Sequence, residues 1–324
     1  MADRRILVGD VGGTHARFAI ADTSQPPFPI EARSDLETDK FDSFAAAVRA
    51  YVEQIGARKP KAVALAVAGP ITKGRVHFTN SGWELSEEDL RALGFARAIL
   101  INDFAALAFS VTSLPPTAFR AIGPDREGLA GAPITILGAG TGLGVSCLAR
   151  YRGRAVPLAS EGGHMSFAPI GDQQLQVLCV LSKRFGHVSL ERVLSGPGLE
   201  NLYSALEEIA GRKPTALEAP EISHGAERGD PACRAAQDMF CAIYGAAAGD
   251  FALAHGARGG VYIAGGIAAK IEDYLIRSRF RAAFEDKGRL ADFVKPIPTR
   301  LILDKDAAFL GAACASLEFQ GEHS

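Results

Sequence analysis

The sequence predicts an α/β fold in which one structural unit occurs twice. Residues 6–21 read ILVGDVGGTHARFAIA, and residues 134–149 read ITILGAGTGLGVSCLA. Each stretch contains an apolar strand, a glycine-rich turn and a second apolar strand, which is typical of a β-hairpin. The recurrence of such a unit indicates an internal duplication. Strands alternate with helical patterns along the rest of the chain, as they do in α/β domains.

The chain between the two hairpins continues this alternation. Apolar residues recur at helical spacing from Asp42 to Ile55. Residues 62–68 (AVALAVA) are apolar throughout, which is typical of a central strand covered on both faces. The further elements expected here are a hairpin tip at Lys73-Gly74, a short helix opened by a capping box of Ser86 with Asp89, a strand at 98–101 and a helix at 104–111.

The chain after the second hairpin is expected to be mostly helical. A strand at 260–264 (GVYIA) leads into Gly265-Gly266, and another strand is expected at 299–303. A glycine pair between a strand and a helix lets a ligand approach the backbone near the helix N-terminus. The expected helices lie near 173–185, 190–194, 199–210, 231–255, 268–284 and 306–317.

The length of 324 residues fits two domains better than one core. Pro115-Pro116 opens a loose stretch that ends at Pro133, and we place the domain crossing there. The last helix is expected to return to the first domain. We therefore expect a smaller α/β domain of residues 1–113 plus 304–324 and a larger one of residues 114–303.

Composition excludes several classes of function. The formal net charge is −2, so there is no basic field that would attract nucleic acid. The five cysteines are scattered without a C-x-x-C pair, which favours reduced thiols over disulfides or a zinc knuckle. No apolar run approaches the ~20 residues that span a bilayer. We expect a soluble, cytoplasmic protein with neither a nucleic-acid nor a membrane partner.

The glycine turns are candidate phosphate cradles. Successive backbone N–H groups in such a turn can bind an anion. A carboxylate such as Asp10 beside an anion site would repel the anion. Its presence is explained if a divalent metal is bound to the phosphate and the carboxylate holds the water shell of that metal. A plain glycine-rich hairpin is the alternative. In the second hairpin Gly138, Gly140 and Gly142 stand where the first has Asp10, Gly12 and Thr14, so two such turns would grip a polyphosphate from both sides.

Asp103 is the strongest candidate for catalysis. Ligands of open α/β sheets lie beyond the carboxyl ends of the strands, and the strand at 98–101 delivers Asn102 and Asp103 to that place. Asp103 could accept a proton from a substrate hydroxyl while Asn102 holds another hydroxyl. The alternative is that Asp103 is only the N-cap of the following helix.

Three further polar residues are candidates for binding a polyhydroxylated ligand. Glu161 and His164 are separated by two glycines, which permit a tight turn, and the pair lacks the further ligands that a metal would need. Glu191 is expected to begin a helix, where an acidic residue is favourable without any function. Trp83 could line a sugar or belong to the core.

Other nucleotide and hydrolase motifs are absent from the sequence. There is no G-x-x-x-x-G-K-[ST], and GAGTGLG fails G-x-G-x-x-G because Leu143 stands at the third glycine position. There is also no G-x-S-x-G. A P-loop NTPase, a dinucleotide-binding unit and a nucleophile-elbow hydrolase are therefore not supported.

Seven motifs in order give the chain its resemblance to a known family. They are LVGDVGGTHARFAIAD, TNSGW, INDFAALA, GAGTGLG, SEGGHMSF, HVSLERVLSG and IAGGI. In this order and over nearly the whole chain they resemble the bacterial glucokinases of the actin-like, hexokinase-like ATPase superfamily. The resemblance implies two RNase H-like domains with an interdomain cleft, ATP and Mg²⁺ as cofactors, transfer of phosphate to the 6-hydroxyl of glucose, and a homodimer. The related repressor–kinases have a cysteine-rich zinc motif, whose cysteines this chain lacks, and an N-terminal DNA-binding domain, which we do not expect in this protein.

The resemblance also implies roles for individual residues. Asp103 matches the catalytic base, and Asn102, Asp103, Glu161, His164 and Glu191 match glucose ligands. The first phosphate motif matches Gly9, Asp10, Val11, Gly12, Gly13 and Thr14; the second matches Gly138, Ala139, Gly140, Thr141 and Gly142; the adenosine motif matches Gly265 and Gly266. His15 departs from the family, in which Asn is common. Two alternatives stay open: a kinase for another hexose or an N-acetylated amino sugar, and a sugar-sensing protein without catalysis.

Overall fold

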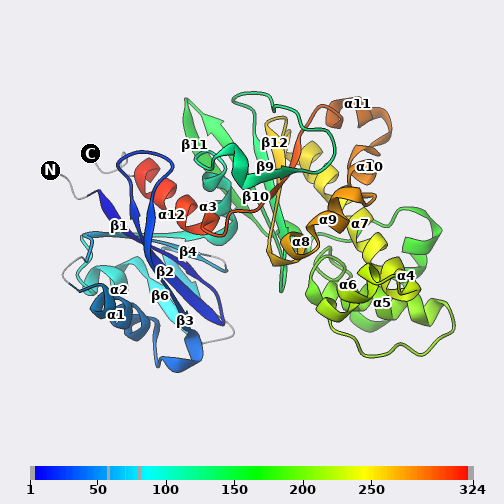
Figure 1. Ribbon diagram of the computed structural model, residues 1–324, viewed down its shortest axis with the longest axis horizontal. Coiled ribbons are helices and arrows are strands. Elements are labelled where there is room, and N and C mark those ends of the chain that lie inside the picture. The colour runs from blue at the N-terminus through cyan, green and yellow to red at the C-terminus, as the bar shows by residue number, and fades with distance from the viewer. Residues whose placement is uncertain (1–3, 57–58, 70, 79–81, 320–324) are drawn as a thin grey trace. The chain divides into compact units, whose positions relative to one another are not determined.

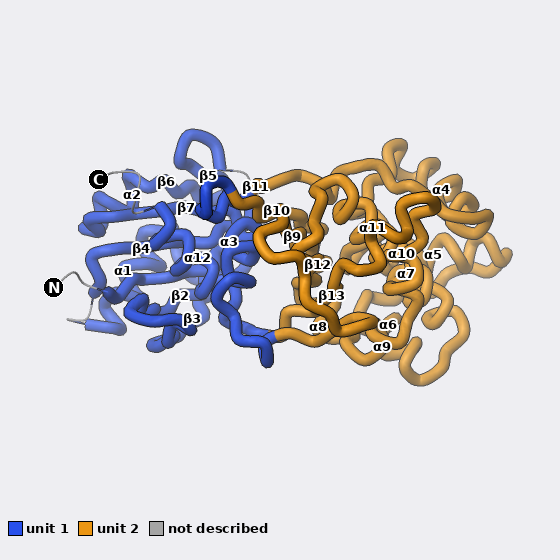
Figure 2. The backbone as a smooth tube through the Cα atoms, turned by 90° about the horizontal axis from the view of Figure 1, so that it is seen from above, with its two compact units in different colours: residues 1–118, 151–157, 304–324 blue, residues 119–150, 158–303 orange. Residues whose placement is uncertain are grey.

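The structure is a computed structural model that describes residues 4–56, 59–69, 71–78 and 82–319. Residues 79–81 of the TNSGW motif lie outside this part. The chain forms two compact units, shown in different colours in Figure 2. Unit 1 comprises residues 1–118, 151–157 and 304–324, and unit 2 comprises residues 119–150 and 158–303. The domain limits expected from the sequence stay a prediction.

Unit 1 contains a five-stranded sheet in the order β3-β2-β1-β4-β7, of which Figure 1 labels β1 to β4. The first hairpin is antiparallel, and β4 and β7 then follow parallel to β1. Every residue of β4 is buried, as its unbroken apolar sequence predicts. The strands of unit 1 are β1 (Arg5–Val11), β2 (His15–Asp22), β3 (Ile30–Glu37), β4 (Ala62–Val67), β5 (Arg75–His77), β6 (Glu84–Ser86) and β7 (Arg97–Asn102).

Helices cover the sheet of unit 1. Phe44 and Tyr51 of the first helix pack on Phe18 of β2, with ring centroids 6.0 and 5.3 Å away. The predicted capping box is present, because Ser86 and Asp89 bond reciprocally at the start of the second helix. The helices of unit 1 are α1 (Phe44–Ile55), α2 (Glu87–Ala92), α3 (Asp103–Ser110) and α12 (Ala307–Glu318), with 3₁₀ turns at Thr38–Lys40 and Pro116–Ala118.

Unit 2 repeats the arrangement of strands seen in unit 1. Its sheet has the order β11-β10-β9-β12-β13-β8, in which the second hairpin is antiparallel and β12 and β13 follow in parallel. The predicted duplication of the glycine hairpin is therefore confirmed. The strands of this sheet are β8 (Phe119–Ala121), β9 (Ile134–Ala139), β10 (Leu143–Tyr151), β11 (Arg154–Ser160), β12 (Gly260–Ala264) and β13 (Thr299–Ile302). Residues 151–157, from the end of β10 into β11, are counted in unit 1.

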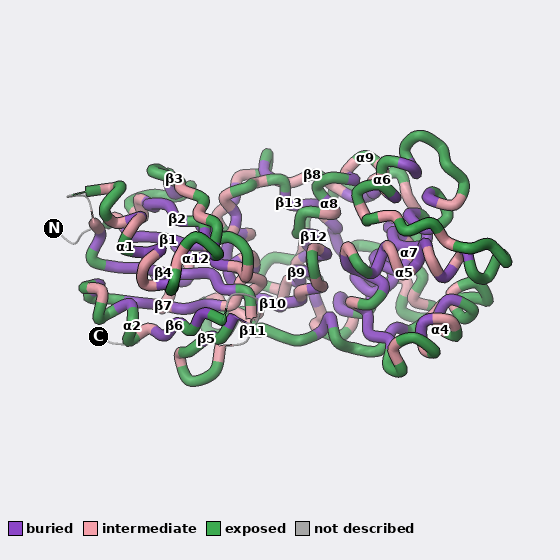
Figure 3. The backbone as a smooth tube through the Cα atoms, turned by 90° about the horizontal axis from the view of Figure 1, so that it is seen from below, coloured by how far each residue is buried: buried purple, intermediate pink, exposed green. Residues whose placement is uncertain are grey.

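The long helix α7 lies in the core of unit 2, among the buried segments coloured in Figure 3. Its bounds match the predicted 231–255. The helices of unit 2 are α4 (Gly171–Phe185), α5 (Gly196–Ile209), α6 (Ala219–Glu227), α7 (Pro231–His255), α8 (Gly266–Lys270), α9 (Glu272–Arg277), α10 (Phe280–Glu285) and α11 (Ala291–Val294), with 3₁₀ turns at Gly162–His164 and Gly288–Leu290.

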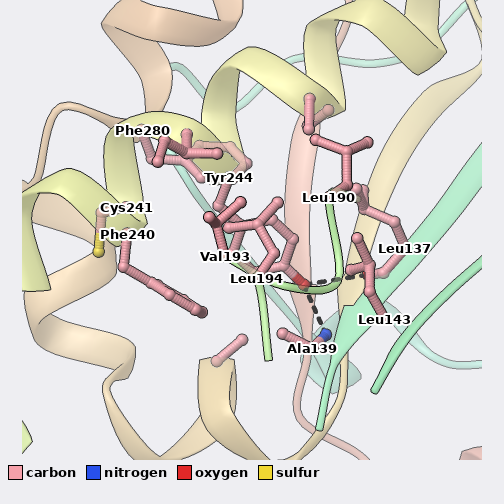
Figure 4. Close-up of a cluster of buried hydrophobic side chains, with 14 of the residues drawn as sticks. Leu137, Ala139, Leu143, Leu190, Val193, Leu194, Phe240, Cys241, Tyr244 and Phe280 are labelled. Atoms are coloured by element: carbon pink, nitrogen blue, oxygen red, sulfur yellow. Dashed lines mark hydrogen bonds between the residues drawn. The ribbon is translucent and has the colours of Figure 1, made fainter. Parts of the chain in front are cut away.

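Tyr244 of α7 ties this core to the second hairpin (Figure 4). Its hydroxyl accepts a hydrogen bond from the Ala139 amide at 3.1 Å and donates one to the Leu137 carbonyl at 3.3 Å. Both partners lie at the end of β9, immediately before the glycine turn. Burial of the phenol raises the pKa of Tyr244 above its usual value, so the hydroxyl stays protonated.

Two helix predictions are wrong. The helix expected at 190–194 is a single hydrogen-bonded turn. Leu190, Val193 and Leu194 have helical spacing because they all point into the core, but the turn cannot continue as a helix, since Ser195 is already the N-cap of α5. The helix expected at 268–284 is three helices, α8, α9 and α10. It breaks at Ile271 and at Ser278, whose hydroxyl accepts from the Phe280 amide.

Several elements were not expected from the sequence, including the short strand β6 and the short helix α11. Strands β3, β8 and β11 lack an apolar run because they lie at the edges of their sheets. Helix α6 begins at a capping box of Glu218 with Glu221.

None of the helices in the described ranges combines the length and the apolar sequence that a membrane span would need.

Candidate functional site

The junction of β7 and α3 in unit 1 places Asn102 and Asp103 at the carboxyl end of a strand. Asn102 is the N-cap: its Oδ1 accepts from the amides of Phe104 and Ala105, both at 3.1 Å. The alternative that Asp103 is the N-cap is therefore wrong. Oδ1 of Asp103 accepts from Asn102 Nδ2 at 3.0 Å and from the Phe104 amide at 2.9 Å. These bonds fix the orientation of the carboxylate.

The first glycine turn connects β1 and β2 and is closed by a bond from the Gly12 amide to the His15 carbonyl at 2.9 Å. Asp10 stands directly opposite Arg17 in the antiparallel register and forms an ion pair with it. Burial raises the pKa of Asp10, and the Arg17 guanidinium opposes that rise. The sequence reasoning missed Arg17, although the hairpin register alone would have placed it beside Asp10.

His15, the residue that departs from the family motif, bonds to a neighbouring strand. Its Nδ1 lies 2.8 Å from Oδ1 of Asp35 on β3. Both side chains are more than half exposed. The imidazole therefore joins the start of β2 to the edge strand β3.

The second glycine turn connects β9 and β10 in unit 2. The Gly140 amide donates to the Gly142 carbonyl at 2.8 Å, and the Gly196 amide donates to the Gly140 carbonyl at 2.9 Å. The amide of Leu143, the residue after the turn, donates to Oε2 of Glu191 at 3.0 Å. Residues 191–196 thus hold the turn from one side.

Glu161 and His164 flank a tight 3₁₀ turn. The His164 amide donates to the Glu161 carbonyl at 2.9 Å, and both side chains are exposed. A Cβ on Gly163 would lie 2.0 Å from the Leu143 carbonyl oxygen, so only glycine lets this turn pack against the start of β10. The turn is also bonded to the segment that carries Glu191, through the Glu191 amide and the Gly163 carbonyl at 2.9 Å.

Glu191 does not begin a helix, which corrects the expectation that it would and removes the alternative in which its acidity only serves a helix dipole. Its backbone amide donates a hydrogen bond to the Gly163 carbonyl, and its carboxylate accepts one from the Leu143 amide beside the second glycine turn. Unit 2 therefore brings together the 161–164 turn, Glu191 and the glycine turn in one hydrogen-bonded group.

The Gly265-Gly266 pair joins the same group. Gly265 has φ of 91° at the junction of β12 and α8. A Cβ there would lie 2.4 Å from the Ala139 carbonyl oxygen. The predicted adenosine motif thus packs directly against the predicted second phosphate motif.

Two other features lie apart from these groups. Trp83 is buried and packs edge-on against Phe44, with ring centroids 5.9 Å apart, so it belongs to the core of unit 1. A cavity of about 210 Å³ in unit 2 is lined by Met165, Leu190 and residues of α7. None of the predicted site residues lines that cavity.

Comparisons with known proteins agree with this architecture. The model of the Glucokinase family matches residues 7–318. The chain is 47% identical to a glucokinase of Caulobacter sp. (strain K31), with 95% of this chain and 94% of that protein covered. It is 45% identical to a glucokinase of Aromatoleum aromaticum, with 95% and 93% covered.

Solved structures are also similar. The crystal structure of a glucokinase from an Antarctic psychrotroph superposes with a TM-score of 0.88 at 38% identity, covering 96% of this chain and 98% of that one. A ROK family glucokinase from Streptomyces griseus, solved with glucose and AMPPNP, shares the fold at 19% identity and a TM-score of 0.66, covering 98% and 100%. The predicted α/β, hexokinase-like fold class is confirmed, and the chain belongs to the glucokinase family.

Proposed function

We propose that this enzyme transfers the γ-phosphoryl group of ATP to the 6-hydroxyl of D-glucose. The observation that carries the proposal is identity of 40–47% to proteins named glucokinase over nearly the full length of both chains. The described side chains supply groups suited to each part of that reaction. The proposed roles are divided between the two units.

Asp103 is proposed as the general base. A carboxylate at a strand end can accept the proton of the attacking hydroxyl as the phosphoryl group arrives. The bonds from Asn102 and from the Phe104 amide fix one carboxylate oxygen. Fixed orientation supports the role because a misplaced base would lose most of its effect.

Four further side chains are proposed as glucose ligands. The Asn102 amide has two N–H donors and uses one of them on Asp103, so the other can donate to a sugar hydroxyl. Glu161 and Glu191 supply carboxylate acceptors, and the exposed His164 imidazole can donate or accept. Such polar groups orient a sugar through several hydroxyls at once.

The glycine turns are proposed to hold ATP. Backbone amides of the two glycine turns, other than those that already donate within the protein such as Gly12, Ala139 and Gly140, would bind phosphate oxygens. Gly265-Gly266 would lie against the adenosine. Among the described residues, no cluster of three or more His, Cys, Asp and Glu could hold a metal ion. Mg²⁺ fits this donor set, because it binds mainly through phosphates and water and needs few protein ligands.

Asp10 would hold a water of the Mg²⁺ shell, and the Arg17 guanidinium opposes the rise in the pKa of Asp10 that burial causes. When bound, Mg²⁺ would neutralise charge that develops on the phosphoryl oxygens. The protein's own part is to position the nucleotide and, through Arg17, to oppose protonation of Asp10.

The surroundings of the enzyme are also proposed from the sequence. We expect a cytoplasmic homodimer without nucleic-acid or membrane partners, in keeping with the formal net charge of −2. Light scattering of the purified protein tests the dimer directly. A mass equal to one chain of 34.1 kDa would contradict it.

The activity is tested by coupling ADP release to a spectrophotometric signal across a panel of sugars. Glucose with MgATP is expected to give the highest kcat/KM, above mannose, fructose and the N-acetylated amino sugars. A higher kcat/KM for one of the other sugars would reassign the substrate. Glucose binding without ADP release from any sugar would make the protein a sensor instead of a kinase.

A further inference from the structure

The carboxylate of Glu191 lies against the backbone of the second glycine turn. Its Oε2 accepts the Leu143 amide at 3.0 Å. A Cβ placed on Gly142 would come within 2.5 Å of the same oxygen, so the carboxylate occupies the space beside that residue. The bond joins residues 48 apart in the sequence.

The segment that carries Glu191 makes further contacts that hold the turn in place. The Gly196 amide donates to the Gly140 carbonyl at 2.9 Å, and Ser195 Oγ donates to the Glu191 carbonyl at 2.8 Å. The Glu191 amide bonds to Gly163 in the turn between Glu161 and His164. A change in the position of Glu191 would therefore be felt on both sides, at the glycine turn and at the 161–164 turn.

We infer that Glu191 couples glucose binding to nucleotide binding by holding the phosphate turn through Leu143. This inference rests on the proposed function, in which Glu191 binds a sugar hydroxyl and the turn binds phosphate. Glu191 is thereby assigned a positioning role toward the nucleotide in addition to its contact with the sugar.

The expected coupling is positive for two physical reasons. A sugar hydroxyl that donates to Glu191 fixes the carboxylate, and with it the Leu143 amide and the turn, so less ordering remains to be done when phosphate binds. The same donation withdraws negative charge from an oxygen that lies beside the phosphate turn, which lowers repulsion of the phosphate. By linkage, the nucleotide must raise the affinity for glucose by the same factor.

The experiment measures the Kd of glucose by calorimetry, without nucleotide and with saturating Mg-AMPPNP. The ratio of the two values is the coupling factor. We expect a factor of about 10 for the unmodified enzyme, within the usual range of such couplings. Gly142→Ala places a methyl group against Oε2 and is expected to reduce the factor to about 2 or less while leaving the chemistry of Glu191 intact.

Gly140→Ala is the matched control, because it makes the same change in the same turn where a Cβ would meet nothing within 4 Å. It is expected to keep the coupling factor within about twofold of the unmodified enzyme, whatever its effect on nucleotide affinity. Glu191→Gln is a second variant in case Gly142→Ala does not fold. It is expected to weaken glucose binding without nucleotide by about tenfold and to lower the factor as well.

The outcomes separate this inference from the proposed function. A factor near 1 in the unmodified enzyme overturns the coupling. The coupling is also overturned if both Gly142→Ala and Glu191→Gln keep the coupling factor of the unmodified enzyme while Glu191→Gln binds glucose weakly. In that case the proposed contact between Glu191 and the sugar remains supported. Normal glucose affinity of Glu191→Gln without nucleotide would instead remove Glu191 from the sugar site, and the inference with it.

Discussion

The side-chain amide of Asn102 donates a hydrogen bond of 3.0 Å to Oδ1 of the adjacent Asp103. The same Asn102 caps α3 through its side-chain oxygen Oδ1. One side chain thus starts the helix and orients the proposed base. Stability and catalysis at this junction can be separated, because they use different atoms of the Asn102 amide.

Two substitutions of Asn102 are expected to separate these effects. Asn102→Ala removes both the cap and the donor, so it should cost ~1 kcal/mol of stability and also lower kcat. Asn102→Ser keeps an oxygen to cap the helix without adding a charge beside Asp103, but it loses the Nδ2 donor. Its stability should stay within about 0.5 kcal/mol of the unmodified protein while kcat falls. Denaturant unfolding and the coupled assay measure the two quantities, and an unchanged kcat in Asn102→Ser would refute the orienting role.

Arg17 is expected to support nucleotide use through Asp10. Arg17→Met removes the guanidinium that opposes the burial-driven rise in the pKa of Asp10, so more of the carboxylate should be protonated and unable to hold the Mg²⁺ water shell. The KM for MgATP should rise about 5- to 10-fold while the Kd of glucose is unchanged.

Arg33→Met is the matched control for Arg17. Arg33 lies on the neighbouring strand β3, pairs with Asp306 and makes no contact with Asp10 among the bonds of the described residues. Equal effects of the two substitutions on the KM for MgATP would mean that general loss of an arginine, and not the Asp10 contact, is responsible.

His255 is expected to make stability depend on pH. It ends α7, bonds to Thr135 Oγ1 at 2.8 Å and stacks on Phe251, and its burial lowers its pKa below 6.5. The unfolded state therefore takes up protons more readily than the folded state, so stability is present above about pH 6.5 and is lost as the pH falls. His255→Gln cannot take up that proton.

The measurement for His255 is the Tm at about pH 7.5 and at about pH 5.5. The fall in Tm on acidification should be smaller in His255→Gln than in the unmodified protein by about 2 °C or more. His187→Gln, which removes an exposed imidazole from the same unit, is the control. The same reduction in both variants would show that the half-buried His255 is not responsible.

The fold could be predicted where the sequence carries a local signal. The two glycine hairpins, the capping box at Ser86 and the helix 231–255 are all set by residues close together in the chain. Strand β3 could not be predicted, because its alternation of polar residues suits an edge that faces water. The spacing of Leu190 and Leu194 satisfied a helical pattern, yet the same spacing serves one buried turn.

The candidate site shows the same limit. Arg17 could have been found, because the hairpin register places it opposite Asp10. The partner of Glu191 could not, because nothing near Glu191 in the sequence indicates that its carboxylate bonds to the Leu143 amide. Contacts between distant segments depend on how the core packs, and that packing appears only in the folded chain.

Asp103 is proposed to accept the proton of the attacking glucose hydroxyl, and the decisive measurement is kcat of Asp103→Ala. We expect kcat with glucose and MgATP to fall about 10²-fold or more, because the attacking hydroxyl loses its proton acceptor, while calorimetry still detects glucose binding. If Asp103→Ala binds glucose and keeps near-normal kcat, Asp103 is not the base.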